Sequence, residues 1–249
     1  MAIPNKVKIA IREKRRACGL VLTWPSADIV EILGAHLDFD YIQIDGEHGA
    51  FNLAEVEEAC RAADMVGMTP IARVPNILPS TINQFLDRGV RGIVAPHIST
   101  KEEAERLVRA CYFGPKGERS FGGGRGVDFG LIKKNRPEYY EEANRQMLVG
   151  IMLEDRAAID NIDDLLSVEG IDFFYFGMND FSQGMGYPGR PDAPEVLQAR
   201  TETIKRIHAA GRLMREDFTN EMNLMDVIVA GVKKITDRRA QESATQGAV

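Results

Sequence analysis

Short apolar runs alternate with longer segments of helical periodicity along most of this chain. Residues 41–45 form one such run, and in residues 53–66 the apolar side chains recur every three or four positions. This alternation predicts parallel β-strands joined by α-helices. We expect strands at residues 19–24, 41–45, 70–74, 92–97, 147–154, 171–177, 212–215 and 232–236, and helices at 28–33, 53–66, 82–86, 157–166 and 196–210, with a further helix that has Ser99 as its N-cap.

Eight strand–helix units in 249 residues favour a (β/α)8 TIM barrel over an open sheet. No shift in composition divides the chain, so residues 1–249 are expected to form a single barrel domain. The last two strands are the weakest part of the pattern. Residues 214–217 are mostly charged, and residues 238–249 have no apolar stripe that could form a closing helix. The C-terminal end of the barrel is therefore expected to be atypical.

The composition narrows the class of protein. A net charge of −6 without a basic stripe argues against a nucleic-acid partner or an anionic membrane surface. The N-terminal residues lack the apolar stretch of a signal peptide, and no apolar run approaches the length that spans a membrane. Three widely spaced cysteines fit neither a disulfide framework nor a thiolate metal site. We expect a cytoplasmic protein that acts on a small molecule.

Two carboxylates, Glu154 and Asp180, follow successive apolar strands. The carboxyl ends of barrel strands meet at one mouth, so these side chains can lie together there. Two carboxylates suit a hard divalent cation such as Mg²⁺ or Mn²⁺ and leave positions for water or a chelating substrate. The alternative is that each acid meets water or an arginine, because their spacing is not a specific metal motif.

Two further strand ends carry residues that are suited to catalysis. His48 follows the second strand and is a candidate for proton transfer, although a histidine in a loop can instead cap a helix. Arg73 ends the third strand and can hold a carboxylate or stabilise an oxyanion. A structural ion pair with a neighbouring acid is nearly as good an explanation of Arg73. His97 ends the fourth strand and ranks second to His48, whereas His36 and His208 lie on predicted helices.

The glycine-rich segment at residues 117–126 resembles a phosphate-binding loop only superficially. No strand leads into it, and neither of the usual phosphate-binding fingerprints is present. A mobile lid or a loop between subunits, with two arginines, is the better interpretation.

Several segments together resemble a known family. They include Ile-Asp-Gly-Glu-His at 44–48 and Phe-Gly-Met-Asn-Asp-Phe-Ser at 176–182, with further matches at 72–74, 86–89, 153–157, 159–161 and 185–189. These segments are similar to the HpcH/HpaI family of metal-dependent class II pyruvate aldolases. The resemblance implies a pyruvate-kinase-like barrel and a homo-oligomer, often a hexamer. It also implies that Glu154 and Asp180 bind a divalent metal ion (Mg²⁺, Mn²⁺ or Co²⁺).

The resemblance also implies roles at the substrate. His48 would be the general base, and Asp87 the carboxylate that makes it more basic. Arg73 would face the enolate oxygen. The backbone from Gly177 through Asn179 to Asp180 would hold the carboxylate of a 2-oxo acid. The expected reaction is cleavage of a 4-hydroxy-2-oxo acid to pyruvate, or a related 2-oxo acid, and an aldehyde.

Two departures from the family leave alternatives open. Met152 stands where relatives commonly have a glutamine that contacts substrate, and the chain diverges after Gly211. In the family, the last helix often packs on a neighbouring subunit, so the usual assembly is in doubt here. The alternatives are oxaloacetate decarboxylation, another change at a carbon–carbon bond through the same enolate chemistry, or a barrel that binds oxo acids without turnover.

Overall fold

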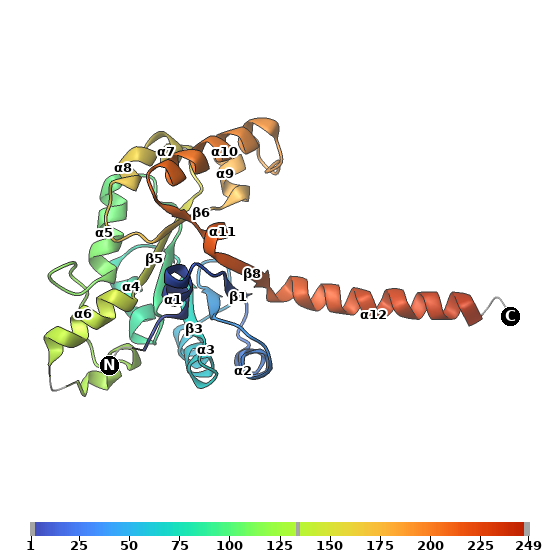
Figure 1. Ribbon diagram of the computed structural model, residues 1–249, viewed down its shortest axis with the longest axis horizontal. Coiled ribbons are helices and arrows are strands. Elements are labelled where there is room, and N and C mark those ends of the chain that lie inside the picture. The colour runs from blue at the N-terminus through green and yellow to red at the C-terminus, as the bar shows by residue number, and fades with distance from the viewer. Residues whose placement is uncertain (1–2, 133–134, 247–249) are drawn as a thin grey trace.

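One curled sheet of eight parallel strands forms the centre of the structure, a computed structural model that describes residues 3–132 and 135–246. Neighbouring strands are hydrogen-bonded in the order β7–β6–β5–β4–β3–β2–β1–β8, which is the order of a TIM barrel opened between β7 and β8 (Figure 1). The strands are β1 (Ala17–Leu22), β2 (Tyr41–Asp45), β3 (Thr69–Arg73), β4 (Gly92–Ala95), β5 (Leu148–Leu153), β6 (Phe173–Phe176), β7 (Leu213–Met214) and β8 (Thr219–Asn223).

Helices connect the strands and cover the outer face of the sheet. Apolar strand residues such as Ile42, Ile44 and Ile151 are fully buried against the helices, because the outward face of each strand must be shielded from water. The helices are α1 (Lys6–Glu13), α2 (Ala27–His36), α3 (Leu53–Met65), α4 (Pro79–Asp87), α5 (Lys101–Cys111), α6 (Arg136–Gln146), α7 (Arg156–Asp160), α8 (Ile162–Leu166), α9 (Met178–Gly184), α10 (Pro194–Ala209), α11 (Arg215–Phe218) and α12 (Leu224–Gln246), with a 3₁₀ helix η1 (Arg125–Gly130).

Alternate strand residues point to the inside of the curled sheet, because side chains on a strand alternate between its two faces. The lower interior is apolar and includes Ile71, Val94, Leu148 and Phe173, with Val7 of α1 packed against them. The two faces of the sheet therefore bury separate apolar clusters, as the alternating strands and helices predict.

A polar cluster lies in the interior near β7 and β8. The buried Arg215 donates a hydrogen bond to Gln43 Oε1 at 2.8 Å and forms an ion pair with Glu221 of β8. The hydroxyl of Tyr41 donates to the same Glu221 carboxylate at 3.0 Å. Of the charged residues after β7, only Arg215 faces inward; Glu216 and Asp217 instead pair with Arg200 and His208 of α10.

The predicted eighth strand at residues 232–236 is wrong, and so is the expectation that no helix follows it. Those residues lie within α12, which projects from the body (Figure 1). Apolar residues recur at helical spacing from Leu224 through Ile228 to Ile235, so the run at 232–236 belongs to a helical pattern. The strand that pairs with β1 is instead β8, whose sequence Thr-Asn-Glu-Met-Asn has no apolar run.

The other boundaries differ in detail. The N-cap of α5 is Thr100, with Glu103 completing the capping box, one residue later than expected. The predicted helix at 157–166 is two short helices that meet at Asn161, whose side chain donates to the Ser99 carbonyl oxygen. The remaining strands agree with the predicted ones to within about three residues at each end. The chain thus has the predicted TIM-barrel-type α/β fold with an atypical C-terminal end.

Candidate active site

Asp45 and Arg73 form the upper layer of the interior at the carboxyl ends of β2 and β3. They are register partners on these parallel strands, so their side chains emerge side by side on the same face. Arg73 Nε and Nη2 donate to the two oxygens of Asp45 at 3.0 and 2.5 Å. Burial acts to raise the pKa of Asp45, but the hydrogen bonds from Arg73 and from the backbone outweigh it and lower the pKa. This two-point ion pair is the alternative considered for Arg73 from sequence, and it fixes the guanidinium at the mouth.

Asp45 also shapes the turn that follows β2. Its Oδ1 accepts hydrogen bonds from the backbone N–H groups of Glu47 and His48, at 3.2 and 3.1 Å. The N–H of Gly46 donates to the carbonyl oxygen of Arg73, and a side chain at Gly46 would collide with that oxygen. The turn is therefore docked on β3 in one conformation.

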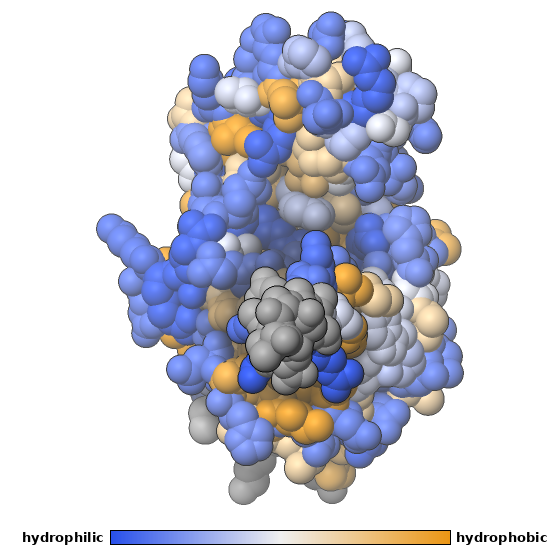
Figure 2. Space-filling model, turned by 90° about the vertical axis from the view of Figure 1, so that its right-hand side faces the viewer, coloured by the Kyte–Doolittle hydropathy of each residue, from blue (hydrophilic) through white to orange (hydrophobic). Residues whose placement is uncertain are grey.

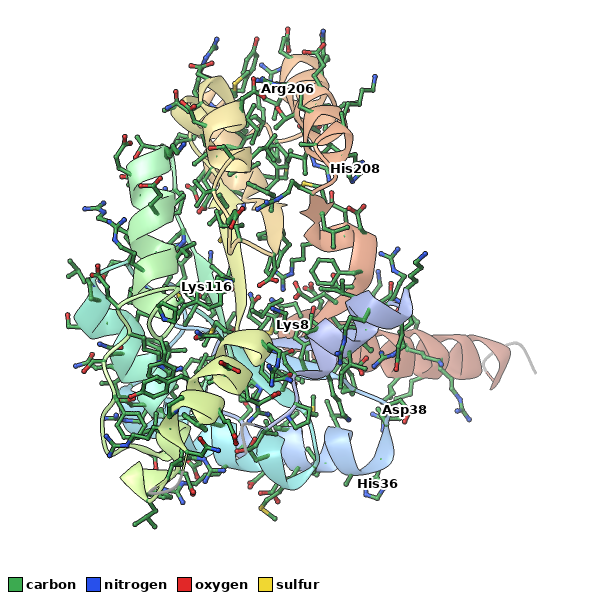
Figure 3. All side chains as sticks on the ribbon, turned by 60° about the vertical axis from the view of Figure 1, so that its left-hand side comes forward. Lys8, His36, Asp38, Lys116, Arg206 and His208 are labelled. Atoms are coloured by element: carbon green, nitrogen blue, oxygen red, sulfur yellow. The ribbon has the colours of Figure 1, made fainter. Side chains whose placement is uncertain are left out.

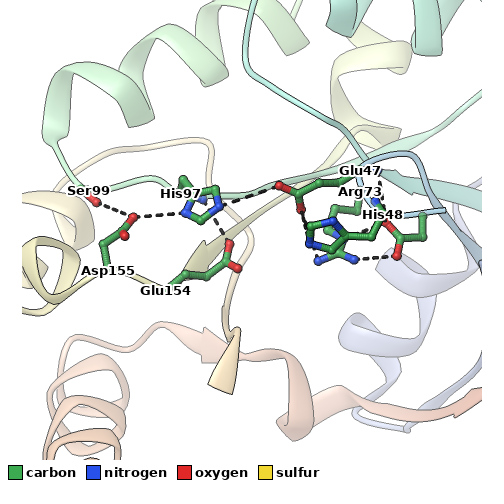
Figure 4. A network of polar contacts seen from close by, with 8 residues as sticks. Glu47, His48, Arg73, His97, Ser99, Glu154 and Asp155 are labelled. Carbon is green, nitrogen blue, oxygen red and sulfur yellow. Dashed lines mark hydrogen bonds and ion pairs between the residues drawn. The ribbon is translucent and has the colours of Figure 1, made fainter. Parts of the chain in front are cut away.

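Glu47 links this turn to the next strand ends (Figure 4). Its carboxylate lies 3.2 Å from Arg73 Nη1 and 3.8 Å from the Nε2 of His97. The side chain is only 13% exposed, and its Oε2 has no partner in hydrogen-bonding geometry. An ion pair without a hydrogen bond leaves part of the hydrogen-bonding capacity of this buried carboxylate unsatisfied.

Glu154, directly after β5, is almost completely buried, with 1% of its surface exposed. Its Oε1 accepts a single hydrogen bond, from the backbone N–H of His97 at 3.1 Å. Burial raises the pKa of Glu154, and the nearby carboxylates of Glu47 and Asp180 raise it further, although His97 opposes them. Glu47 and Asp180 are thus both close enough to repel the Glu154 carboxylate.

Gly177, at the end of β6, makes room for Glu154. A β-carbon at position 177 would lie 2.6 Å from the Glu154 carboxylate, so a side chain there would displace that carboxylate. The chain then enters α9, whose first turn carries Asn179 and Asp180. The carbonyl oxygen of Asn179 accepts a hydrogen bond from the hydroxyl of Ser182 at 2.8 Å, which holds this turn in place.

His97 is the second imidazole at the mouth. Its Nδ1 lies 3.3 Å from Asp155 Oδ2, which also accepts a hydrogen bond from Ser99 (Figure 4). Partial burial acts to lower the pKa of His97, but the carboxylates of Glu154 and Asp155 outweigh it and raise the pKa. The backbone of His97 has φ +52°, a left-handed conformation that is uncommon for a residue with a side chain.

His48 lies beside these residues but points more toward solvent. Its side chain is 64% exposed, and its Nε2 is 3.9 Å from Glu47 Oε2. By contrast, His36 and His208 lie on outer helices, as predicted, and are exposed there (Figure 3). His48 is therefore the more exposed of the two imidazoles near the mouth, compared with 51% exposure for His97.

Asp87 is the one predicted site residue that the structure does not bring to the mouth of its own chain. It ends α4 and packs against the glycine-rich segment, where its Oδ1 is buried without a hydrogen bond. Burial raises the pKa of Asp87, and the opposing influences come from Arg119 and Arg88, not from His48. Within one chain, the carboxylate next to His48 is Glu47.

The predicted lid is also fixed away from the mouth. The backbone of Arg119 donates to the Tyr112 carbonyl oxygen, and that of Glu118 donates to the Arg109 carbonyl oxygen. Gly124 and Gly126 lie so close to the end of α4 that a β-carbon at either would collide with its backbone. The segment is therefore part of the packed body.

The donor set at the mouth suits a hard cation. The buried carboxylate of Glu154 has one hydrogen bond and two carboxylates near it, so a divalent ion would relieve both its burial and the repulsion. Within residues 3–132 and 135–246, no three side chains of His, Cys, Asp or Glu are already arranged as a metal site. A site with two protein carboxylates agrees with this, because water and a chelating substrate would complete it.

Met152 lies below Glu154 on the inward face of β5. It is 3% exposed and packs in the interior apolar cluster, in register with Tyr175 of β6. The floor of the mouth at this position is consequently apolar.

Asp45, Glu47 and Asp155 belong to the site, although the sequence alone does not indicate their roles. Asp45 and Glu47 lie within the motif at 44–48, and the alternation along β2 indicates that Asp45 faces inward with Gln43. No pattern in the sequence reveals that Glu47 reaches two neighbouring strand ends or that Asp155 contacts His97.

These features define an α/β barrel with an acidic, arginine-anchored site at the carboxyl ends of its strands. The sequence profile of the HpcH/HpaI aldolase/citrate lyase family matches residues 19–239. The chain is 34% identical to a 4-hydroxy-2-oxovalerate aldolase of Rhodococcus jostii, over 84% of this chain and 79% of that protein. It is 35% identical to a hydroxypyruvate/pyruvate aldolase of Agrobacterium fabrum, over 84% and 77%.

A solved structure supports the same assignment. A HpcH/HpaI aldolase/citrate lyase family protein from Burkholderia cenocepacia superposes with a TM-score of 0.82 and 25% identity, covering 96% of this chain and 99% of that one. The chain belongs to the HpcH/HpaI aldolase/citrate lyase family.

Proposed function

We propose that this protein is a divalent-metal-dependent aldolase that cleaves a 4-hydroxy-2-oxo acid to pyruvate, or a related 2-oxo acid, and an aldehyde. Relatives about 35% identical to it are named aldolases of such substrates. The observation that best supports the proposal is the buried carboxylate of Glu154 beside those of Glu47 and Asp180, an excess of negative charge that a cation would balance. The whole chain is proposed to act as one barrel domain.

Glu154 and Asp180 are the proposed ligands of the cation, with Mg²⁺, Mn²⁺ or Co²⁺ as candidates. When bound, such an ion supplies Lewis-acid stabilisation of the charge that develops on the 2-oxo group as the C3–C4 bond breaks. Gly177 supports this placement, because a side chain at this position would occupy the space of the Glu154 carboxylate. The backbone from Gly177 through Asn179 is proposed to hold the substrate carboxylate.

Arg73 is proposed to face the oxygen on which negative charge develops. Asp45 holds two of its guanidinium nitrogens, and Nη1 lies toward Glu47 on the side of the mouth. A fixed cationic donor needs little reorganisation during the reaction, and one such donor contributes about 3–4 kcal/mol to lowering the barrier.

His48 is proposed to take the proton of the 4-hydroxyl group during cleavage. The exposed imidazole at the rim of the mouth supports this role, and Glu47 is the neighbouring carboxylate in the same chain, 3.9 Å from its Nε2. Asp87 would interact with His48 only across an interface between two subunits, because it lies away from His48 in its own chain.

The C-terminal helix supports a homo-oligomer as the working form. Between residues 225 and 235 of α12, six large apolar side chains are 42–58% exposed: Met225, Val227, Ile228, Val229, Val232 and Ile235. Hydrophobic residues lie around the base of this helix, which is viewed end on in Figure 2. A helix of this kind needs a partner surface, and a second copy of the chain is the simplest one. No described helix is long and apolar enough to cross a bilayer.

The direct test is pyruvate release from a panel of 4-hydroxy-2-oxo acids with added Mg²⁺, Mn²⁺ or Co²⁺, with oxaloacetate as a parallel substrate. We expect metal-dependent release of pyruvate and aldehyde together from at least one hydroxy acid. Loss of carbon dioxide from oxaloacetate without any aldol cleavage would replace the proposal with the decarboxylase alternative. Metal-dependent binding of pyruvate without turnover of any substrate would favour a binding protein.

The assembly is tested separately by light scattering of the variant Ile228→Asp, with Asp237→Ser on the same helix as control. We expect only Ile228→Asp to lower the molar mass. An unchanged mass in Ile228→Asp would mean that α12 does not hold the subunits together.

A further inference from the structure

A cavity lies at the opposite end of the strands from the candidate active site. Its volume is about 290 Å³, and it is lined at the starts of β4 and β5 by Val90, Arg91 and Met147. This is the end of the molecule where α6 and the N-terminus lie (Figure 1). The six residues of β5 separate the two ends by roughly 20 Å at about 3.3 Å per residue. The cavity is therefore outside the mouth of the same chain.

Three arginines, Arg91, Arg119 and Arg125, converge on this cavity. Arg91 and Arg125 share one carboxylate, since each places a guanidinium nitrogen 2.5 Å from an oxygen of Asp64. The Nε atoms of all three arginines are buried without a hydrogen-bond partner. One carboxylate satisfies only part of the donor capacity that these side chains bring together.

Arg119 is the most poorly satisfied of the three. It is 9% exposed, and among the described residues its guanidinium has neither a hydrogen-bond acceptor nor an ion-pair partner. Its guanidinium lies over the ring of Phe113, whose centroid is 4.5 Å from Cζ. Burial lowers the pKa of Arg119, while Tyr139 and Asp87 are near enough to oppose this electrostatically but accept no hydrogen bond from it. Proteins rarely leave a buried charge in this condition.

The walls of the cavity define what would fit. Arg119 and Arg125 provide free N–H donors, Val90, Ala143 and Met147 provide apolar surface, and the exposed ring of Phe129 lies at the rim. Gly126 also forms part of the wall. It packs directly on the end of α4, where a β-carbon would collide with the Leu86 carbonyl oxygen. The planar fork of a guanidinium matches carboxylate and phosphate oxygens.

We propose that this cavity binds a small organic oxyanion, a carboxylate or a phosphate ester with a short carbon skeleton, through Arg119 and Arg125. The anion accepts the hydrogen bonds that Arg119 lacks, and its carbon skeleton lies against Val90 and Met147. Because Arg119 and Arg125 belong to the glycine-rich segment at 117–126, the bound anion ties that segment to the starts of β4 and β5. The glycine-rich segment thus contributes to anion binding through arginine side chains rather than through a phosphate-binding fingerprint.

The test is isothermal titration calorimetry of the full-length protein, freed of metal with a chelator, using inorganic phosphate and succinate as separate probes. Removing metal prevents either probe from binding by chelation at Glu154 and Asp180. The variants are Arg119→Gln and Arg125→Gln. Arg145→Gln on the exposed face of α6 is the matched control, and Arg73→Gln reports on the mouth.

We expect one site per chain for at least one probe in wild type, Arg145→Gln and Arg73→Gln, and at least tenfold weaker binding in Arg119→Gln and in Arg125→Gln. Binding of phosphate alone identifies a phosphate ligand, and binding of succinate alone identifies a carboxylate. The proposal is overturned if neither probe saturates the wild type, if Arg73→Gln abolishes binding, or if both cavity variants bind as wild type does.

Circular dichroism shows whether Arg119→Gln is folded. If it is not, Arg119→Lys replaces it, because lysine keeps the charge but loses the fork. Weaker binding in folded Arg119→Lys and Arg125→Gln then supports the proposal, and wild-type affinity in both contradicts it.

Discussion

Arg73 of β3 is held by both oxygens of Asp45, its register partner on β2, at 3.0 and 2.5 Å. The same carboxylate accepts hydrogen bonds from the backbone N–H groups of Glu47 and His48. One buried acid therefore positions the proposed oxyanion-stabilising group and the proposed base together. This arrangement makes Asp45 a positioning residue, although it is not proposed to touch the substrate.

Replacing Asp45 with asparagine should damage both stability and turnover. The amide side chain of the Asp45→Asn variant accepts fewer hydrogen bonds than a carboxylate and leaves the largely buried Arg73 without its counter-charge. We expect a loss of about 3 kcal/mol in the free energy of unfolding and a clear fall in kcat. Urea unfolding and steady-state kinetics measure the two effects. Wild-type kcat in a folded Asp45→Asn variant would show that Asp45 does not position the site.

The same ion pair predicts how stability depends on pH. The pKa of Asp45 is lower in the folded chain than in the unfolded one, where it is about 3.9. Its contribution to stability is therefore complete above about pH 5, and it is lost progressively as the pH falls through the unfolded-state pKa to the lower, folded-state pKa. The stability difference between wild type and Asp45→Asn should shrink as the pH is lowered from 6 to 2.5. A difference that is constant over this range would refute the assignment.

Glu154→Gln should separate stability from activity. The pKa of Glu154 is raised in the folded chain, so ionising this carboxylate at neutral pH costs stability when no cation is bound. Glutamine keeps the acceptor for the His97 N–H and removes the charge repulsion. We expect metal-free Glu154→Gln to be more stable than metal-free wild type by about 1 kcal/mol, yet inactive with metal. A less stable, folded variant would mean that the carboxylate is already compensated within the protein.

His48→Ala tests the proposed base. The exposed imidazole contributes little to packing, so the variant should fold normally and bind metal as wild type does. We expect kcat for cleavage to fall roughly 10²-fold or more, the usual effect of losing a general base. His97→Ala is the informative comparison, because His97 is the other imidazole at the mouth. Full activity in His48→Ala together with a loss in His97→Ala would transfer the role to His97.

The sequence predicted most of the barrel because seven of the eight strands show an apolar run or a recognisable strand end. β8 was missed because its residues, including Thr219 and Glu221, face a polar interior around Arg215 and have no apolar run. The run at 232–236 was assigned as a strand because a short apolar segment cannot be distinguished from part of a helix by periodicity alone. Only the pairing of β8 with β1 shows that residues 219–223, and not residues 232–236, form the eighth strand.

The candidate site was predictable where a residue's role depends on its place at a strand end. Glu154, Arg73 and His48 are brought to one mouth by the fold alone, and Asp180 follows on α9. Contacts between loops were not predictable, since the reach of Glu47 to His97 depends on how two turns lie relative to each other. The role predicted for Asp87 stays a prediction, because a single chain places this residue away from His48.

Titration of the metal-free protein with Mn²⁺, following Mn²⁺ binding and pyruvate release in the same samples, tests the central claim most directly. We predict one tightly bound Mn²⁺ per chain, activity that rises in proportion to its occupancy, and loss of both in Glu154→Gln and Asp180→Asn. Full activity without metal, or unchanged Mn²⁺ binding in both variants, would contradict it.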